Sequence, residues 1–493
     1  MKFKKIIYFI LAFLLLYIVV NKYIISEGIF TPLKKNISKE TKTKIKKYLF
    51  PYKYMGELQD IADMLSQALE GTNKDVLRLR ERLGKKDLLI SEIPEMIGYG
   101  EFYQEKETIF EINKTNFSFK EFKDDFLVIK KASAARSGSV YIDKIDDKII
   151  ILSGNGLFQY FDKKNLNESR FKTKIIKSNI RDIIKYKDFY SNSKFGVKDL
   201  LIIDDIVYFS FIREVSNNCF NTSILKAKLN FDKLIFEEFF SPAECILGDE
   251  MWFQPHSSGG RMVKFKDKMI FSIGEYLSRG VAQDPKSIFG KNVVLDPLDR
   301  SYYKLLSIGH RNVQGLLFDD ENKTIVSTEH GPQGGDEINV NRDFIRNNDK
   351  INNYGWPMSS YGEHYGCINS KTPSCLDRYA QYPFYKSHSD HGFKEPLKYF
   401  TPSIAISQII KLNNNFFSDQ GKNHLLVGAL GGNPAEGDMS LHYMKISKDY
   451  QKIINHEIIN INSRVRDMVI LDEKQVLISM ETNSTIGILK IVE

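Results

Sequence analysis

The chain has 493 residues, 42% of them hydrophobic and 27% charged, which is the balance of a globular protein with one very large domain or two to three ordinary ones. Its net charge of +8 is concentrated at the N-terminus, because residues 1–50 hold eleven Lys and two Glu. The remainder is close to neutral, so the main body is not expected to offer a basic surface to nucleic acid.

The N-terminus carries a long apolar segment. Ile6 to Val20 is unbroken by any polar residue, three lysines precede it, and the apolar character resumes briefly at Tyr23-Ile24-Ile25. No small-x-small cleavage site follows, and residues 6–25 meet the roughly 20 residues that a bilayer-spanning helix needs. The pattern predicts an uncleaved signal anchor over residues 1–25, a single transmembrane helix.

The lysines around this segment conflict over its orientation. Those before it favour a cytoplasmic N-terminus, whereas the lysines between residues 34 and 47 favour the opposite arrangement. Residues 26–94 read as a Lys-rich linker and a short helical stalk. Apolar residues at helical spacing predict two short helices within residues 57–83. The linker lysines either lie against anionic lipid or are simply solvated.

From about residue 95 the pattern changes to strands. An apolar strand, a short polar turn and a second apolar strand recur six times. The copies begin near Val140, Asp199, Met262, Gln314, Ile404 and Arg466. Because a strand-rich unit repeated at such intervals is typical of propellers, residues 95–493 are predicted to form an all-β, six-bladed β-propeller. The longest interval contains an insertion, residues 335–399.

The four cysteines fall into two pairs. Cys367 and Cys375 lie close together in a stretch rich in Ser, Thr and Pro, and Cys219 and Cys245 remain for the second pair. An even count in an exported chain is compatible with two disulfides, although geometry decides the pairing.

The most informative segment lies at the start of the insertion in the longest interval. It reads EHGPQGGDEIN over Glu329–Asn339, and NYGWP follows at Asn353–Pro357. Gly and Pro at this density are typical of a loop whose backbone approaches another group closely. The carbonyls of Gly331 and Pro332 and the carboxylates of Asp336 and Glu337 are oxygen ligands of the kind that calcium takes. On composition alone, a tight structural loop is the alternative.

Together with four further segments, this loop resembles the glucose/sorbosone dehydrogenase family. In the family's order, the other segments are His256 to Arg261 with Ile273–Glu275, Gly309–Leu316 (GHRNVQGL), Pro402–Ala405 (PSIA) and Arg464–Asp467 (RVRD). Five motifs in order across roughly residues 250–480 indicate homology. The resemblance implies a six-bladed propeller that carries pyrroloquinoline quinone (PQQ) on calcium, in a domain outside the cytoplasmic membrane.

The resemblance also implies roles for three polar residues. His256 is the general base, since an imidazole tuned near neutral pH can take a hydroxyl proton while hydride leaves the same carbon. Arg311 polarises the quinone carbonyl that receives the hydride, and Asn312 contacts the quinone beside it. His256 is separated from its Gly-Gly-Arg by one residue more than the family's usual spacing.

The same resemblance implies how the cofactors are held. Gly331, Pro332 and Glu337 would bind the calcium, which would act as a Lewis acid on the quinone. Arg464 and Arg466 alternate on one predicted strand, so both side chains share a face. Two guanidiniums there suit the carboxylates of PQQ, and a surface salt-bridge pair is the alternative.

The sequence also departs from the family pattern. Where the family has a cofactor-contacting Lys, residues 430–434 read LGGNP; Pro255 precedes His256 where Asp is frequent; and the family's early cofactor-binding Gln is not recognisable near residues 137–141. We therefore expect weak cofactor affinity. Aromatic residues of the insertion, Tyr354 to Tyr365, either stack on a sugar or quinone or pack the insertion onto the blades.

These observations predict a PQQ- and calcium-dependent enzyme that oxidises an aldose sugar at its anomeric hydroxyl. It would be anchored as a single-pass protein of the cytoplasmic membrane, with its main domain outside, and would pass electrons to an acceptor that the sequence does not identify. The alternative is a calcium-stabilised propeller that has lost redox chemistry and binds a glycan or a protein. A propeller hydrolase of the lactonase type would need calcium-binding Asn and carboxylates from several blades, a set the sequence does not present.

Overall fold

The computed structural model describes residues 98–124, 140–154, 156–184, 196–249, 253, 255–342, 351–417, 421–431, 438–481 and 485–492. The chain divides into two compact units, Met1–Arg82 and Leu83–Glu493, and every described residue belongs to the second. The predicted anchor, the Lys-rich linker and the two stalk helices lie outside the described residues.

The predicted localisation requires correction. Within the described ranges, no helix is long and apolar enough to cross a membrane. The longest helix there, α6 (Pro373–Gln381), has 9 residues, whereas a spanning helix needs about 20. The prediction of a single-pass membrane protein rested on Ile6–Ile25 alone, and the structure gives it no support.

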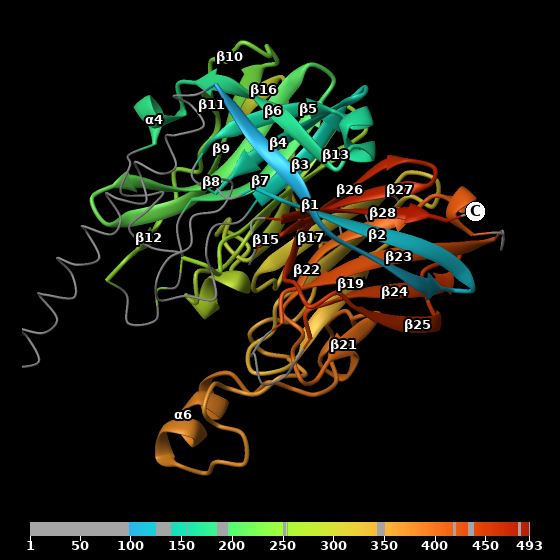
Figure 1. Ribbon diagram of the computed structural model, residues 1–493. Coiled ribbons are helices and arrows are strands. Elements are labelled where there is room, and N and C mark those ends of the chain that lie inside the picture. Colours follow the sequence, from blue (N-terminus) through green and yellow to red (C-terminus); the bar gives the residue numbers. More distant parts are fainter. Residues whose placement is uncertain are drawn as a thin grey trace, which may run out of the picture. The chain divides into compact units, whose positions relative to one another are not determined.

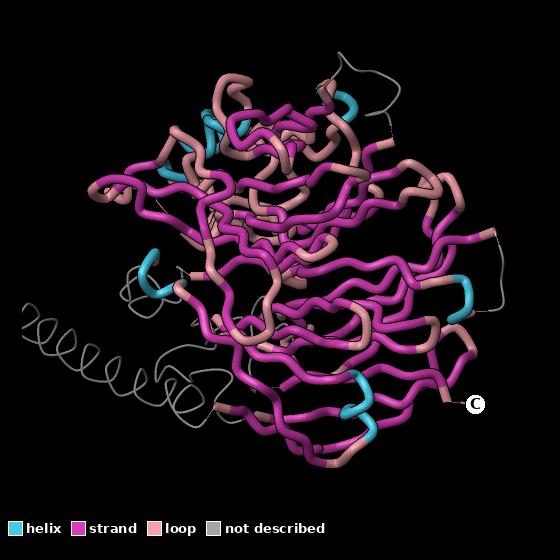
Figure 2. The backbone as a smooth tube through the Cα atoms, turned by 90° about the horizontal axis from the view of Figure 1, so that it is seen from above, coloured by secondary structure: helices cyan, strands magenta, loops and turns pink. Residues whose placement is uncertain are grey.

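Strands form most of the described residues, and the short helices lie at the edges of the strand array (Figure 2). Six antiparallel groups of four strands recur, called blades 1 to 6 here. Blade 1 contains β3 (Val140–Ile145), β4 (Lys148–Ser153), β5 (Phe158–Asp162) and β6 (Arg170–Ser178). Blade 2 contains β7 (Val197–Ile203), β8 (Ile206–Ser216), β9 (Cys219–Lys228) and β11 (Glu237–Phe240). Blade 3 contains β13 (Gly259–Phe265), β14 (Lys268–Ile273), β15 (Lys291–Asp296) and β16 (Asp299–Ile308).

The second half of the array follows the same plan. Blade 4 contains β17 (Val313–Asp319), β18 (Thr324–Glu329), β19 (Asp336–Asn341) and β21 (Lys398–Phe400). Blade 5 contains β22 (Ile406–Leu412), β23 (Lys422–Ala429), β24 (Ser440–Ser447) and β25 (Ile453–Asn460). Blade 6 contains β26 (Val465–Asp472), β27 (Gln475–Met480), β28 (Thr485–Ile491) and β2 (Thr115–Lys123).

Smaller elements connect and edge the blades. The minor strands are β10 (Lys233–Leu234), β12 (Ile246–Leu247) and β20 (Asn352–Asn353), which pair with β6, β9 and β16. The short helices are η3 (Lys163–Asn167), α4 (Ile180–Ile183), η4 (Arg279–Ala282), η5 (Ser389–His391) and η6 (Asn414–Phe416). None of these short helices forms the crossover between two parallel strands that an α/β fold requires, in agreement with the all-β prediction.

The first strand of each blade contacts the first strand of the next. These contacts run from β3 through β7, β13, β17, β22 and β26 and return to β3. A closed ring of six inner strands is consistent with the predicted six-bladed propeller. The two ends of the described chain close it, because the early strand β2 pairs with the C-terminal β28 (Figure 1). Strand β1 (Tyr99–Ile112) then pairs with both β2 and β6 and joins blade 6 to blade 1.

The hydrophobic core lies between blades rather than at the ring's centre. One cluster of buried side chains occupies each of the six interfaces between neighbouring blades. The inner strands and those next to them are therefore covered on both faces, which explains the near-continuous apolar run of β4. Polar residues at the strand ends line the centre of the ring.

The insertion between β19 and β21 carries α6, which projects from the sheets (Figure 1). Cys367 and Cys375 form a disulfide across the start of α6, and Cys219 and Cys245 form the second disulfide. Both predicted pairings are confirmed. Several aromatic residues of the insertion are packed: Trp356 is buried against Phe384 of the insertion and against Ala282 of η4 in blade 3.

Candidate functional site

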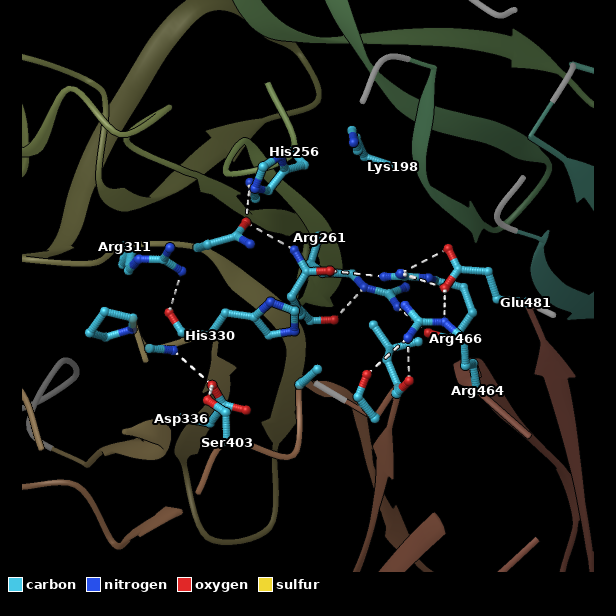
Figure 3. Close-up of a pocket in the computed structure, with 18 of the residues that line it drawn as sticks. Lys198, His256, Arg261, Arg311, His330, Asp336, Ser403, Arg464, Arg466 and Glu481 are labelled. Atoms are coloured by element: carbon cyan, nitrogen blue, oxygen red, sulfur yellow. Dashed lines mark hydrogen bonds and ion pairs between the residues drawn. The ribbon is translucent and has the colours of Figure 1, made fainter. Parts of the chain in front are cut away.

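A pocket of about 360 Å³ lies where the inner strands begin. Every blade contributes a residue at or next to the start of its inner strand: Tyr141, Lys198, Arg261, Gln314, Ala405 and Arg466. Loops next to the strands of blades 3, 4, 5 and 6 add the rest of the wall. The ring geometry thus gathers side chains that are far apart in sequence around one cavity (Figure 3).

Most of the predicted site residues line this pocket. His256, Arg311, Asn312, Gly331, Pro332, Arg464 and Arg466 all belong to its wall. The extra residue after His256 therefore does not remove it from the site. Glu337 is the exception and does not line the pocket. Strand β19 begins at Asp336, and because successive strand residues point to opposite faces, Asp336 reaches the pocket while Glu337 does not.

Arg311 is held by several neighbours. Its Nη1 donates to the carbonyl of His330 at 3.0 Å and its Nη2 to the hydroxyl of Tyr365 at 3.3 Å. The guanidinium lies 5.5 Å from the centre of the Trp356 ring, a cation–π contact. Its Nε is buried and has no hydrogen-bond partner among the described residues, so one N–H remains available to a ligand.

The neighbouring His310 supports Arg311 rather than facing the pocket. Its Nδ1 lies 2.8 Å from a carboxylate oxygen of Glu329, and its Nε2 lies 2.7 Å from the hydroxyl of Ser307. The other Glu329 oxygen accepts the backbone N–H of Arg311. All of these groups are buried, so this chain of contacts fixes the position of the Arg311 backbone.

Arg464 and Arg466 share one carboxylate. Glu481 lies 3.2 Å from Nε of Arg464 and 3.2 Å from Nη2 of Arg466. Arg466 also donates to the side-chain oxygen of Gln314 at 2.9 Å, and its Nε is buried without a partner among the described residues. The common face predicted from the alternation on this strand is therefore present. Both residues line the pocket, and Nη1 of Arg464 also donates to the carbonyls of Leu430 and Gly431.

Arg261, the last residue of the Gly-Gly-Arg motif, is neutralised within the wall. Its Nη1 lies 2.7 Å from Asp199 and 3.0 Å from Asp467, and its Nε donates to the Gln314 carbonyl at 2.6 Å. Its remaining nitrogen donates to the carbonyl of Arg466. With every group committed to the protein, Arg261 is a structural centre of the site.

The loop of Gly331 and Pro332 turns tightly beside the pocket. The backbone N–H of Gly331 donates to Asp336 at 2.9 Å, and Asp336 also accepts from Ser403 and Ile406. A Cβ on Gly331 would lie 2.2 Å from the carbonyl oxygen of Gly335, so only glycine fits. Within the described ranges, neither the Gly331 nor the Pro332 carbonyl accepts a hydrogen bond.

Glu337 lies behind this loop with a second carboxylate. It pairs across the sheet with Glu329, accepts from Asn339 at 3.2 Å and lies 3.5 Å from Nε2 of His388. Burial, followed by the charge of Glu329, holds the pKa of Glu337 well above its ordinary value. Among the described residues there is no group of three or more His, Cys, Asp or Glu side chains suited to one metal ion. A calcium ion in the pocket would therefore depend on main-chain carbonyls.

Lys198 and Glu481 were missed by the sequence analysis. Both line the cavity, yet neither belongs to a recognised motif. Lys198 had a detectable signal, because it directly precedes Asp199, where one of the six strand copies begins. Tyr365, one of the insertion's aromatic residues named from the sequence, lines the pocket and is 50% exposed, whereas Tyr354 and Trp356 are buried.

Comparison with known proteins points to one family. A model of the family "Glucose / Sorbosone dehydrogenase" matches residues 173–489, which is more than half of the chain. The aldose sugar dehydrogenase YliI of Escherichia coli is 31% identical over 185 residues, and an uncharacterized protein of Synechocystis is 31% identical over 163 residues. These alignments cover 35% and 33% of this chain but only 44% and 32% of the two relatives.

Solved structures show the same fold. The soluble aldose sugar dehydrogenase of Escherichia coli in its apo-form matches with a TM-score of 0.54 at 20% identity, over 72% of this chain and 95% of that one. A crystal structure of glucose dehydrogenase matches with a TM-score of 0.54 at 20% identity, over 72% and 96%. The long match to the family model decides the assignment: the chain belongs to the glucose/sorbosone dehydrogenase family, a family of oxidoreductases.

Proposed function

We propose that the protein is a PQQ- and calcium-dependent dehydrogenase that oxidises an aldose sugar at its anomeric hydroxyl. The observation that carries the proposal is the meeting of His256 and Arg311 in one pocket with Arg464 and Arg466. These residues come from three separate motifs, and they combine a proton acceptor with a surplus of positive charge.

The residues of the pocket fit PQQ, a flat quinone with several carboxylates. Two guanidiniums, those of Arg464 and Arg466, lie at one part of the wall and both contact Glu481, and guanidiniums pair well with carboxylates. The buried Nε groups of Arg311 and Arg466 have no partner among the described residues, and such donors are stabilised by a ligand oxygen. When bound, PQQ supplies the two-electron acceptor that no side chain of the pocket provides.

Each of the protein's own residues would then carry out one part of the reaction. His256 takes the proton of the sugar's anomeric hydroxyl, because imidazole is the side chain best suited to that transfer near neutral pH. Arg311 stabilises the oxygen that gains negative charge, and the contacts with His330 and Trp356 hold its guanidinium in place before reaction. The half-exposed ring of Tyr365 offers a surface on which a sugar can pack.

Calcium is part of the same proposal. Gly331 and Pro332 line the pocket, their carbonyls accept no hydrogen bond in the described part of the chain, and carbonyl oxygens are suitable calcium ligands. The carboxylate of Glu337, the third ligand predicted from the sequence, lies behind the loop. A single ion held by all three groups is therefore not favoured by this arrangement, and the other ligands would come from the cofactor and water.

Reconstitution tests the proposal. The full-length chain is incubated with PQQ and calcium, and reduction of an artificial dye acceptor is followed with a panel of aldoses. We expect sugar-dependent reduction that requires both PQQ and calcium. Failure of the wild-type chain to bind PQQ at micromolar concentration with calcium present would overturn the enzyme assignment.

A further inference from the structure

Arg279 does not line the pocket, yet two contacts of Arg311 lead back to it. It is the first residue of η4, in the connection between β14 and β15 of blade 3. Its guanidinium carbon lies 5.5 Å from the ring centre of Trp356, 5.7 Å from that of Tyr382 and 5.6 Å from that of Phe384. All three rings belong to the insertion, so a single cation of blade 3 lies in an aromatic cage that the insertion builds.

The first route to Arg311 passes through Trp356. The centre of this ring also lies 5.5 Å from the guanidinium carbon of Arg311. The ring is buried, with Ala282 and Phe384 packed on it. Two hydrogen bonds hold the backbone of Trp356, whereas the two torsions of its side chain are set by the neighbours of the ring. Arg279 is one of these neighbours, and it therefore helps to decide where the ring meets Arg311.

The second route passes through His364. Nη1 of Arg279 lies 2.9 Å from Nδ1 of this imidazole, and Nε2 lies 2.9 Å from the carbonyl oxygen of Tyr382. Because a carbonyl can only accept, Nε2 carries the hydrogen and Nδ1 accepts from Arg279. His364 is buried and directly precedes Tyr365, whose hydroxyl lies 3.3 Å from Nη2 of Arg311. Arg279 thus reaches Arg311 through two independent contacts.

The charges between the two arginines make this arrangement sensitive. Arg279 and Arg311 repel each other, and the buried carboxylate of Glu275 attracts both. The backbone N–H of Glu275 donates to the Arg311 carbonyl at 3.0 Å, so this carboxylate lies close to the catalytic arginine. Without Arg279, the attraction of Glu275 acts on Arg311 alone and draws that guanidinium out of its place in the pocket wall.

We infer that Arg279 is a positioning residue for the oxidation: it holds Trp356 and Tyr365 against Arg311 and so fixes the guanidinium that faces the quinone. The inference rests on the proposed function. It also links the packing of the insertion on blade 3 to the chemistry of the pocket. Precise placement matters, because displacement of a reacting group by about 1 Å can cost about 100-fold in rate.

Tryptophan fluorescence tests the contact in the ligand-free, full-length chain. The chain has two tryptophans, Trp252 and Trp356, so Trp252→Phe leaves Trp356 as the only indole. In that background we expect Arg279→Met to raise the acrylamide quenching constant of Trp356 and to shift its emission to longer wavelength. Arg213→Met is the matched control, because Arg213 of β8 pairs with Glu238 and does not line the pocket.

Kinetics test the positioning itself. With saturating PQQ and calcium, Arg279→Met should lower kcat about 10- to 100-fold, while the Kd for PQQ stays within a few-fold of the wild-type value. Arg279→Lys keeps the charge and a donor for His364, so it should recover most of kcat. In an Arg311→Met background, Arg279→Met should cause no further loss, because the residue that it positions is already gone.

The outcomes separate the two claims. If the wild-type chain shows no sugar-dependent reduction with PQQ and calcium, the proposed function and this inference both fail. If the wild type is active but Arg279→Met changes neither kcat nor the quenching of Trp356, only the inference is overturned. Equal losses of kcat in the wild-type and Arg311→Met backgrounds also overturn it, since they indicate a general structural role. Melting temperatures confirm that the variants are folded, and Arg279→Gln replaces Arg279→Met in every comparison if the latter does not fold.

Discussion

Arg261 and Asp467, which are 206 residues apart in the sequence, form a buried ion pair with Nη1 3.0 Å from Oδ1. Arg261 begins blade 3 and Asp467 begins blade 6, so the pair connects two non-adjacent blades. Asp467 also accepts from the amide of Ile142 in blade 1 and from the side chain of Gln408 in blade 5. Two motifs of the family therefore meet in one interaction that ties the ring together beside the pocket.

Removal of Arg261 should destabilise the fold strongly. Arg261→Met leaves the carboxylates of Asp199 and Asp467 buried without their shared cation, and breaking a buried pair in this way costs about 3–5 kcal/mol. Urea unfolding of both proteins would measure the difference. Lys264→Met, which removes an exposed cation three residues later on the same strand, should change stability by less than about 0.5 kcal/mol. A similar small loss for both variants would contradict this role of Arg261.

Much of the fold could be predicted from the sequence because the inner strands of a propeller have a local signal. Five of the six predicted strand pairs coincide with the first two strands of a blade. The sixth, near Ile404, differs: η6 occupies Asn414–Phe416, and β23 begins only at Lys422. Three consecutive Asn residues favour turns over strand pairing, which explains the longer connection.

The site was predictable only where residues belonged to motifs. The order and tilt of the blades determine which strand ends meet at the pocket. The spacing of residues along the chain does not reveal that order or tilt. Lys198 and Glu481 were therefore missed, although each lies at the end of an apolar strand pattern. The placement of Asp336 rather than Glu337 at the pocket depends on the single residue at which β19 begins.

Stability should fall as the pH drops because of His456. Its Nε2 lies 2.9 Å from Nδ1 of His442, and burial, followed by the charge of His442, lowers its pKa to about 4. A histidine in the unfolded chain titrates near pH 6.5, so between about pH 6.5 and about pH 4 only the unfolded state binds this proton. The native state is therefore destabilised in that window, and no effect is expected above it.

His456→Gln isolates this contribution. The variant cannot take up the proton in either state, so it should lose less unfolding free energy than the wild type between about pH 7.5 and about pH 5. Urea unfolding at the two pH values gives the comparison, with the exposed His391→Gln as control. Equal losses in the wild type and His456→Gln would show that His456 does not contribute.

The disulfide of the insertion should affect sugar binding. Cys367 lies two residues after Tyr365, and Arg378 of α6 donates to the Tyr365 carbonyl at 3.0 Å. Replacing both cysteines frees this segment and with it the ring beside Arg311, so the sugar KM should rise several-fold with little change in PQQ affinity. The equivalent double replacement of Cys219 and Cys245 is the control, since neither lines the pocket. A change in PQQ affinity without a change in KM would contradict this reasoning.

Gly331 should control calcium binding. A Cβ there would clash with the backbone of Gly334 and Gly335, so Gly331→Ala must displace the backbone of this loop, which lines the pocket. With the wild type we expect calcium to raise the melting temperature by mass action and chelator to lower it again. Gly331→Ala should lose this response. Gly280→Ala should keep it, because an added Cβ there meets only the Tyr382 hydroxyl at 3.7 Å. If calcium and chelator leave the wild-type melting temperature unchanged, calcium does not belong to this site.

His256 should be required for turnover but not for cofactor binding. It lines the pocket from the turn before β13, outside the cluster of guanidiniums that would hold the carboxylates of PQQ. Loss of a positioned general base typically costs about 10²–10⁴-fold in rate, so His256→Gln should lower kcat by that amount. Its Kd for PQQ should remain within a few-fold of the wild-type value, and the exposed His391→Gln should match the wild type in both. Loss of PQQ binding in His256→Gln would instead make His256 a residue that shapes the pocket. An unchanged kcat with bound PQQ would require a different base.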